Sequence, residues 1–462
     1  MVKIKITLED LFNLNGSVIY NPDSFKPLSY VEIDSRKINK PCLFVAIKGG
    51  KFDGHDFIHD AIEKGAEAVI INRRKLEKFN SLNIPFITVP DTIKAYGELA
   101  NRWRNKLGAK VISITGSNGK TTTKEMIAVL LEEKFNVVKS EANNNNHIGV
   151  PLTIFSADEN CEMLILEQGT NHIGEIPYSA KISEPDYALI TNIGDSHLEF
   201  LKSREGVFKE KSALFDAAEK RGGIIFINVD DPIINKNKNR YKNIVTYGFK
   251  KSAEVKGKIV NYDDLGRAEI SIQYHEENFK VKLPLSGESN AKNFLAAAAI
   301  ALKIGLTENE IINASKRLKP VHGRLEIKEY SKAILVDDTY NASPASVEAA
   351  YYFLKKVKRY KNKIMVLGDI FELGKQAPKF HRDLAKIFNE DKNTTVLTIG
   401  DLMKYLHREL KKRKIKTIHF DTRDALKLYL QYEDIDNSAI LVKGSRGMKM
   451  EEFINILEQR FE

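Results

Sequence analysis

The sequence has few cysteines and no long apolar run, and each absence excludes a class of protein. Only Cys42 and Cys161 occur in 462 residues. They are far apart, which excludes a CxxC metal site or a disulfide framework and fits a reducing compartment. The longest strongly apolar run, 294–302, is far below the roughly 20 residues that span a membrane. The start of the chain has no long apolar segment typical of a secretory signal. We therefore expect a cytoplasmic protein without membrane insertion.

The overall composition is that of a folded protein with several domains. Hydrophobic residues make up 42% and charged residues 29% of the chain, and the length predicts about three domains. The formal charge of +10 raises the possibility of a nucleic-acid partner. The densest basic clusters, 355–361 and 411–414, lie at the ends of predicted helices, where cations complement the helix dipole. We expect no nucleic acid, and an anionic small substrate fits the charge as well.

The stretch with the most specific chemistry resembles a phosphate-binding loop. An apolar run at 111–115 enters a glycine turn and a helix-compatible run at 124–134 leaves it. The loop residues are Gly116, Ser117, Asn118, Gly119, Lys120, Thr121 and Thr122. Glycines let backbone N–H groups turn toward an anion, while the lysine would contact phosphates and a threonine hydroxyl Mg²⁺. The loop is a short version, with Ile114 where the usual pattern has glycine. The alternative is an ordinary strand-to-helix turn whose lysine faces solvent.

The order of predicted elements divides the chain into three α/β parts. Residues 1–105 predict short strands, among them 43–47, and a helix after a turn within 54–65. Residues 106–320 alternate strands and helices, which favours a parallel sheet covered on both faces. Its predicted elements are strands at 111–115, 163–167, 187–193 and 223–228, a hairpin at 268–285 and a helix at 290–305. In residues 321–462 the alternation begins again, with strands at 333–336, 363–367, 395–399, 417–420 and 439–442.

Polar clusters follow three strands of the central part, at 167–172, 192–197 and 228–231. Ligands of such sheets bind at the carboxyl ends of the strands, so we expect these clusters to converge. Glu167 comes directly after an apolar strand, and a metal role is favoured for it. For His172 and His197 a hydrogen-bonded loop role is the commoner alternative. Lys211 lies on a predicted helix at 206–220, where a lysine is usually solvated.

Motifs spread over nearly the whole chain resemble those of the Mur ligase family. The matching stretches are 34–36, 43–46, 53–57, 115–123, 143–151, 171–176, Asn290 and Asn293, Gly323 and Arg324, 337–342, 368–374 and 443–446. The resemblance implies a small N-terminal α/β domain that binds a UDP-sugar, a central parallel-sheet P-loop ATPase domain and a C-terminal Rossmann-like α/β domain. An Asp-Asn-Pro-Arg motif, typical of the sister ligase that adds the third residue, is absent from the last domain. Within the family, the chain is therefore most similar to the enzymes that add D-alanyl-D-alanine.

The resemblance also implies an activity and roles for individual residues. A carboxylate of UDP-N-acetylmuramoyl tripeptide would be activated by ATP as an acyl phosphate and captured by the amine of D-alanyl-D-alanine. Lys120, His197 and Lys211 would be catalytic, with Lys211 carbamylated, and Thr121, Glu167, His197 and Lys211 would hold Mg²⁺. Asn290 and Asn293 would lie near the adenine, Asp338 would close on the nucleotide, and Asp34, Ser35 and Arg36 would receive the UDP-sugar. A role in peptidoglycan precursor synthesis, and hence in cell shape and division, follows, and we expect a monomer.

Two alternatives remain at the level of the sequence. One keeps the chemistry and changes the substrate, as in another Mur-type ligase or a folylpolyglutamate-type ligase. The other is a nucleotide-regulated binding protein without ligase activity. The role of Lys211 separates them, because a binding switch needs no second metal held by a carbamylated lysine.

Overall fold

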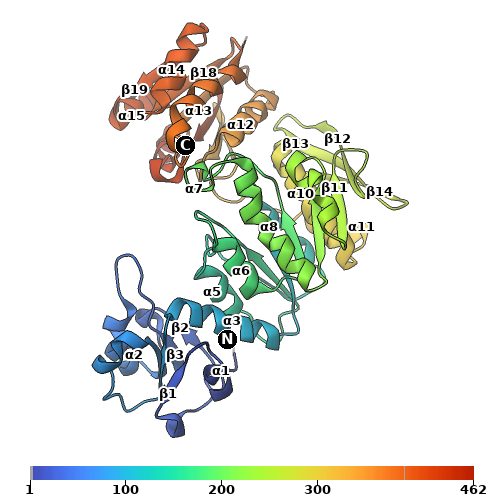
Figure 1. Cartoon of the computed structure of the whole chain (residues 1–462). Helices are drawn as coiled ribbons and strands as arrows, with labels where there is room; N and C mark the ends of the chain where they lie inside the picture. The colour runs from blue at the N-terminus through green and yellow to red at the C-terminus, as the bar shows by residue number, and fades with distance from the viewer. Residues whose placement is uncertain (1–3, 390) are drawn as a thin grey trace.

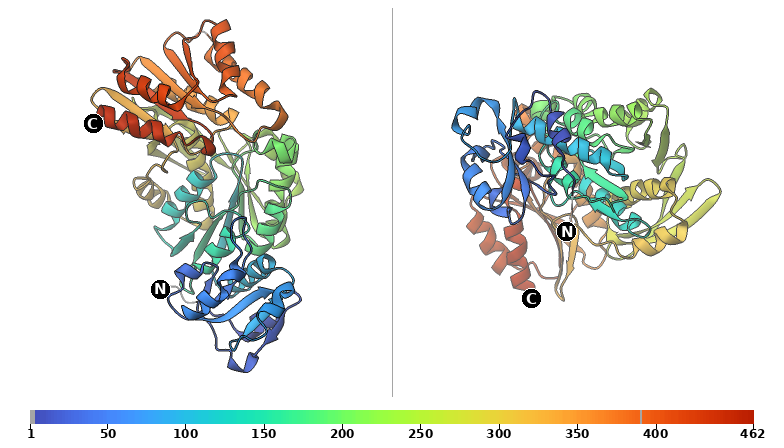
Figure 2. Two further views of the ribbon diagram at one scale, coloured as in Figure 1. Left: turned by 90° about the vertical axis from the view of Figure 1, so that its left-hand side faces the viewer. Right: turned by 90° about the horizontal axis from the view of Figure 1, so that it is seen from below.

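The computed structural model describes residues 4–389 and 391–462 and contains three α/β parts arranged in a row (Figure 1). The N-terminal part lies at one end, the central part in the middle and the C-terminal part at the other end, as the side view in Figure 2 also shows. Each part has its own β-sheet. This architecture confirms the predicted three-domain α/β fold.

The N-terminal sheet has five strands in the order β1-β5-β4-β3-β2, in which only β1 is antiparallel to its neighbour. The strands are β1 (Val18–Tyr20), β2 (Val31–Glu32), β3 (Cys42–Val45), β4 (Ala66–Asn72) and β5 (Phe86–Val89), and the helices are α1 (Leu8–Phe12), α2 (Ile58–Glu63) and α3 (Thr92–Lys106). Strands β3 and β5 are buried throughout. Continuous apolar runs of this kind are expected for strands covered on both faces.

The central sheet has nine strands in the order β14-β13-β12-β11-β10-β9-β6-β8-β7. They are β6 (Lys110–Thr115), β7 (Val137–Lys139), β8 (Met163–Glu167), β9 (Tyr187–Ile190), β10 (Ile224–Asn228), β11 (Ile244–Gly248), β12 (Val255–Tyr262), β13 (Arg267–Tyr274) and β14 (Glu277–Ser286). All pairs are parallel up to β12, and the predicted hairpin β13–β14 then extends the sheet in antiparallel fashion. Strands β7, β11 and β12 were not predicted, and the predicted strand 187–193 ends at Ile190.

Helices cover both faces of the central sheet. They are α4 (Lys120–Leu131), α5 (Gly149–Phe155), α6 (Glu175–Ser183), α7 (Leu198–Leu201), α8 (Arg204–Lys220), α9 (Pro232–Lys236), α10 (Glu288–Ile304) and α11 (Glu308–Ser315). Leu189 and Phe226 pack in the core beneath α4 and α10, whereas their neighbours Ala188 and Ile225 pack on the opposite face beneath α6 and α8. This alternation follows from the two-residue period of a strand.

The C-terminal sheet has six strands in the order β15-β16-β20-β17-β18-β19, and only β15 runs antiparallel to its neighbour. The strands are β15 (Glu326–Glu329), β16 (Ala333–Asp338), β17 (Asn362–Gly368), β18 (Thr394–Ile399), β19 (Thr417–Phe420) and β20 (Ser438–Lys443). The helices are α12 (Pro344–Lys356), α13 (Ala377–Asp383), α14 (Met403–Lys412), α15 (Arg423–Tyr432) and α16 (Glu451–Phe461). All five strands predicted here fall within observed strands.

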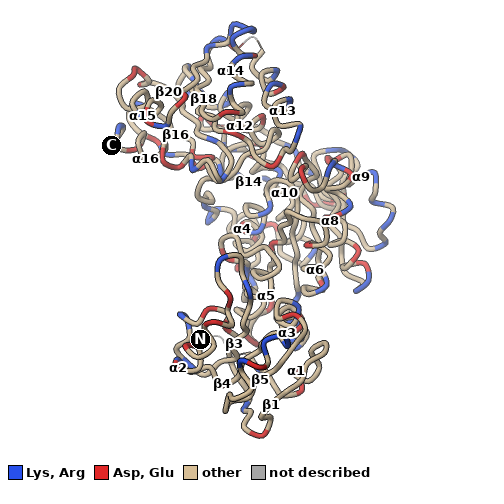
Figure 3. Tube along the Cα trace, turned by 60° about the vertical axis from the view of Figure 1, so that its left-hand side comes forward, with Lys and Arg blue, Asp and Glu red and all other residues tan. Residues whose placement is uncertain are grey.

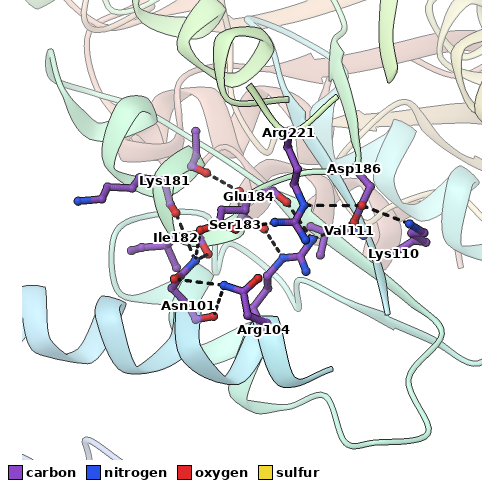
Figure 4. A network of polar contacts seen from close by, with 12 residues as sticks. Asn101, Arg104, Lys110, Val111, Lys181, Ile182, Ser183, Glu184, Asp186 and Arg221 are labelled. Atoms are coloured by element: carbon purple, nitrogen blue, oxygen red, sulfur yellow. Dashed lines mark hydrogen bonds and ion pairs between the residues drawn. The ribbon is translucent and has the colours of Figure 1, made fainter. Parts of the chain in front are cut away.

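A buried polar contact joins α3 of the N-terminal part to the end of α6 in the central part (Figure 4). Arg104 is only 3% exposed; its Nε donates to Ser183 O at 2.8 Å, and its terminal nitrogen donates to Glu184 O and to Asp186 Oδ2, each at 2.9 Å. Asn101 Nδ2 donates to Ile182 O at 2.9 Å. The last carbonyls of a helix have no partners inside it, so α3 supplies the cap for α6.

Charged residues occur in all three parts, with Lys and Arg interleaved with Asp and Glu along the chain (Figure 3). Within the described residues, every helix is too short or too polar to span a bilayer.

Candidate active site

The phosphate-loop stretch forms the predicted strand, turn and helix. Strand β6 ends at Thr115, the turn passes through Gly116 (φ +151°) and Gly119 (φ +81°), and α4 begins at Lys120. The first amides of a helix have no carbonyl one turn earlier, so those of α4 are available to an anion at its positive end. Lys120 Nζ donates to Gly116 O at 2.8 Å. Burial lowers the pKa of Lys120, and the Glu167 carboxylate acts in the opposite direction.

The loop is braced by the segment that follows β9. Thr191 Oγ1 donates to Asn118 O at 2.6 Å, and Asn192 Nδ2 donates to the same carbonyl at 3.0 Å. Asn192 Oδ1 accepts from Asn118 N at 3.1 Å. The strand predicted to reach residue 193 stops at Ile190, and the two residues after it make these contacts.

The predicted convergence of polar clusters is found around one cavity of about 940 Å³. Residues of the phosphate loop and of all three polar clusters line it, together with Asn290, Asn293 and Asp338. A volume near the upper end of the usual range for small-molecule sites fits a large ligand such as a nucleotide. The cavity also contains side chains of the C-terminal domain, so two domains form it.

Glu167 lies at the end of β8 and has one carboxylate oxygen without a partner. Its Oε1 accepts a hydrogen bond from Asn145 Nδ2 at 2.9 Å. Its Oε2 is buried and has no hydrogen bond within the described part of the chain. A buried, unpaired carboxylate oxygen is unfavourable unless a cation completes its shell. The side chain therefore fits a metal ligand at the edge of the cavity.

Lys211 is buried, contrary to the expectation that a lysine on this helix is solvated. It is 1% exposed and lies among Val207, Phe208, Leu214 and Phe215 on the inner face of α8. This i, i+4, i+7 spacing was visible in the sequence and would have predicted the burial. Burial and the neighbouring Lys120 ammonium lower the pKa of Lys211 well below its usual range. The amine is thus held in an environment that favours its uncharged form.

The two histidines differ in their surroundings. His197 has a left-handed backbone (φ +52°) and its Nδ1 lies 2.7 Å from Glu372 Oε2 of the C-terminal domain, although the two groups are not aligned as a hydrogen bond. His172 packs against Phe200, with ring centroids 4.3 Å apart and ring planes inclined by 53°, and its Nδ1 lies 3.4 Å from Glu175 Oε1. Both line the cavity. Only His197 links two domains.

The C-terminal domain contacts the phosphate loop directly. Arg324 donates to Thr121 Oγ1 at 3.0 Å, and Ser343 Oγ donates to Asn118 Oδ1 at 3.2 Å. Asp338 Oδ2 accepts from Lys443 Nζ at 2.6 Å, which places this carboxylate in the same cavity. The chain is therefore in a closed arrangement. Arg324, Asn145, Glu372 and Lys443 were not assigned as site residues. All four lie in stretches that match the family motifs, and this was the signal that could have found them.

The predicted adenine residues lie at the start of α10. Asn290 is buried and its Nδ2 donates to Ser286 O at 2.7 Å. Asn293 faces Gly119, where an added Cβ would lie only 2.4 Å from the Asn293 side-chain oxygen. The second asparagine is thus packed against the turn of the phosphate loop, where only glycine fits.

Asp34, Ser35 and Arg36 are not among the residues that line the cavity. They form a short turn in the N-terminal domain, in which both Arg36 Nε and its terminal nitrogen donate to Asp34 at 2.8 Å. The Arg36 guanidinium lowers the pKa of Asp34 to about 2. The structure therefore separates these three residues from the other predicted site residues.

Three models of Mur ligase domains match the chain: the Mur ligase family catalytic domain at residues 27–104, the Mur ligase middle domain at 114–301 and the Mur ligase glutamate ligase domain at 323–446. The chain belongs to the Mur ligase family. Among relatives, it is 34% identical to the UDP-N-acetylmuramoyl-tripeptide–D-alanyl-D-alanine ligase of Bacillus subtilis, over 98% of each chain.

Solved structures of similar proteins agree. A crystal structure of MurF from Acinetobacter baumannii has a TM-score of 0.89 at 27% identity and covers 99% of this chain and 100% of its own. MurF from Thermotoga maritima, solved in complex with ADP, has a TM-score of 0.83 at 28% identity and covers 94% of this chain and 97% of its own.

Proposed function

We propose that this chain is an ATP-dependent ligase that joins D-alanyl-D-alanine to UDP-N-acetylmuramoyl tripeptide in peptidoglycan precursor synthesis. The observation that carries the proposal is the cavity in which the phosphate loop and Glu167 lie beside Arg324 and Asp338 of the C-terminal domain. The buried Lys211 amine is not part of the cavity lining, and it lies close enough to Lys120 and Glu167 for their charges to act on it. The relatives that match almost the whole chain include ligases of this specificity.

The reaction forms one amide bond and cleaves one phosphoanhydride bond. The terminal carboxylate of the tripeptide attacks the γ-phosphorus of ATP and ADP leaves, which gives an acyl phosphate. The amine of D-alanyl-D-alanine then attacks the acyl carbon, the tetrahedral intermediate loses phosphate, and the amine loses a proton. Because water would hydrolyse the acyl phosphate, the reactants must be aligned in a closed site.

The residues of the cavity have roles that fit these steps. The loop from Gly116 to Thr122 and the start of α4 bind the phosphates, and Lys120 neutralises charge that builds up during phosphoryl transfer. Asn290 and Asn293 line the same cavity and would contact the adenine, and Asp338, also in its lining, would close on the nucleotide. Asp34, Ser35 and Arg36 would receive the UDP-sugar outside this cavity, in a domain spanning 1–105 next to domains at 106–320 and 321–462.

Mg²⁺ fits the donor set of the cavity. Thr121 and Glu167 would hold one ion, and the unpaired Oε2 of Glu167 is the buried acceptor that such an ion satisfies. His197 and Lys211 would serve a second ion once Lys211 is carbamylated. In that modification the uncharged Lys211 amine attacks CO₂ and releases a proton, and its lowered pKa favours the uncharged amine. Bound Mg²⁺ would neutralise phosphate charge in the transition state.

A direct test supplies the purified chain with ATP, Mg²⁺, UDP-muramoyl tripeptide and D-alanyl-D-alanine. Phosphate release should require both peptide substrates, and the product mass should equal their sum less one water. With ¹⁸O in the terminal carboxylate of the tripeptide, one labelled oxygen should appear in the released phosphate, because it bridges the acyl phosphate. The Lys120→Ala variant is the control: it should release no phosphate and still bind the UDP-sugar.

Other outcomes separate the alternatives. Equal phosphate release with single amino acids would indicate a different Mur-type ligase, and a polyglutamate product would indicate a folylpolyglutamate-type enzyme. Nucleotide binding without any consumption in the presence of both peptides would refute the ligase proposal and leave a nucleotide-regulated binding protein.

A further inference from the structure

A second group of potential metal ligands lies where the chain passes from the central to the C-terminal domain. His322, Glu326 and Asp337 each offer one donor atom, and these atoms lie within 4.8 Å of one another. Glu326 is the first residue of β15 and pairs directly with Asp337 of β16. Successive side chains of a strand point to opposite faces, so Asp337 points away from the face on which Asp338 meets the nucleotide cavity. The group is separate from the candidate active site.

Asp337 has an oxygen that the rest of the protein leaves unpaired. The side chain is completely buried, and its Oδ1 accepts hydrogen bonds from Thr339 N at 3.1 Å and from Thr339 Oγ1 at 2.6 Å. Its Oδ2 is buried and has no hydrogen bond within residues 4–389 and 391–462. Such an oxygen is unfavourable unless a cation or a donor completes its shell.

Two carboxylates lie close together at Asp337. Glu326 stands directly opposite it, and like charges at opposite positions of a strand pair are destabilising. The nearest lysine on β15, Lys328, is bound to Glu458 of α16, with Nζ at 2.5 Å from Oε1. His322 is the remaining group, and its Nδ1 lies 3.0 Å from Glu326 Oε2, an oxygen that Gly323 N also approaches at 3.4 Å. The Lys328 ammonium also attracts Glu326 and Asp337, yet it makes no hydrogen bond to either, and Asp337 Oδ2 keeps no donor within the described residues.

We propose that His322, Glu326 and Asp337 bind a divalent transition-metal ion, with Zn²⁺ as the representative case. Two ligand atoms that are each about 2.1 Å from one ion are separated by about 3.0–3.4 Å at the usual coordination angles, and His322 Nδ1 and Glu326 Oε2 have this separation. One imidazole nitrogen with two carboxylate oxygens suits Zn²⁺ or a similar ion, whereas Mg²⁺ prefers oxygen alone. The His322 side chain is 79% exposed, so an ion can enter from solvent.

A metal at this position would fix the segment that carries Arg324. Arg324 lies between the first two ligands, its guanidinium stacks 4.0 Å from the Tyr340 ring, and it donates to Thr121 of the phosphate loop. Occupancy therefore ties the connection between the two domains to β16. The site does not depend on the proposed ligase activity.

The test measures binding of Zn²⁺ to the full chain by calorimetry, with Mg²⁺ in large excess to fill oxygen-only sites. The variants are His322→Ala and Glu326→Gln, and His275→Ala is the matched control because His275 is another exposed histidine, at the turn between β13 and β14. His322 and Glu326 are not fully buried, so both substitutions should leave the fold intact. His197 in the active-site cavity can also take Zn²⁺, so the decisive quantity is the difference between variants.

The wild type and His275→Ala should bind one more equivalent of Zn²⁺ than His322→Ala. Glu326→Gln should lower the affinity for this Zn²⁺ ion by about 10- to 100-fold or more, since a loss of that size is typical even when only a residue that supports a metal ligand is removed. With Co²⁺ as the probe, the visible absorption of the bound ion should change in His322→Ala and not in His275→Ala. Equal stoichiometry and affinity in the wild type and His322→Ala would overturn the proposal.

Discussion

Replacing Gly116 by alanine tests whether the phosphate loop needs its observed backbone. A Cβ at this position would lie 1.9 Å from Thr191 Oγ1 and 3.1 Å from Thr191 Cβ. The residue also has φ +151°, which L-residues rarely adopt. Thr191 cannot move away freely, since its hydroxyl braces the loop at Asn118 O. The alanine variant must therefore relax into a loop conformation that differs from the one observed.

The size of the effect follows from two contributions. Holding a non-glycine residue in such a conformation costs about 1–3 kcal/mol, and forcing extra atoms into a packed site costs about 1–3 kcal/mol. A bound nucleotide has to restore the original loop, so the sum of about 2–6 kcal/mol is lost from binding. Because about 1.4 kcal/mol corresponds to tenfold, ATP affinity should fall by at least about 30-fold.

Calorimetric titration with ATP and Mg²⁺ measures this loss. Gly108→Ala is the control, because its added Cβ meets no atom within 4 Å, and it should bind ATP like the wild type. Thr191→Ala alone should lose little, since Asn192 still bonds to Asn118 O. The double variant Gly116→Ala/Thr191→Ala should recover about tenfold of the lost affinity, because the closest clash is gone. Wild-type affinity in Gly116→Ala, or no recovery in the double variant, would refute the reasoning.

Three further predictions concern buried charged or titratable side chains. Lys211→Ala should lose turnover and regain part of it with added short carboxylates while ATP affinity changes little; collapse of ATP binding in calorimetry would contradict the metal role. His381 is fully buried, accepts from Ile370 N and donates to a helix carbonyl, and burial lowers its pKa. The contribution of neutral His381 to the free energy of unfolding is present above the pKa of about 6.5 that histidine has in the unfolded chain. It is lost as pH falls below that value, by up to about 1.4 kcal/mol per pH unit. Between pH 7.5 and 5, the urea midpoint of His381→Gln should therefore fall less than that of the wild type. The same pH dependence in both proteins would contradict this explanation. Arg104→Ala removes the donor of two helix-end carbonyls and the nearest guanidinium of Asp186, and should lower stability by about 1–3 kcal/mol. Lys110→Ala, the exposed partner of the same carboxylate, should change the thermal midpoint little.

The sequence predicts best what is local in the chain. The phosphate loop could be predicted because its glycines, lysine and threonines are adjacent and lie between an apolar run and a helical run. The inward position of Glu167 follows from its place after a buried strand. The helix pattern alone predicted a solvated Lys211, and only the family resemblance gave it a catalytic role, although the apolar spacing around it indicates burial. The usual exposure of helical lysines was given more weight than the spacing of apolar residues in this helix.

Contacts between distant residues could not be predicted. Arg324 and Thr121 are 203 residues apart, and Ser343 and Asn118 are 225 apart. These contacts depend on how the two domains pack, and the residue pattern within either segment does not indicate that packing. The short edge strand β7 and the inner strands β11 and β12 were missed for a related reason, since pairing with a neighbour defines them more than their own composition does.

The cap that α3 places on α6 bears on how this protein can be divided. A fragment beginning after residue 105 would contain the whole nucleotide-binding sheet, yet it would lack both Asn101 and Arg104. The carbonyls of Ile182, Ser183 and Glu184 would lose their donors, and Asp186 would lose its buried guanidinium. A methyl group at Gly97 of α3 would collide with Tyr178 of α6, which shows how closely these two helices approach. A minimal ATP-binding fragment should therefore start at Asp91, so that α3 is retained, and not at the border suggested by the sheets.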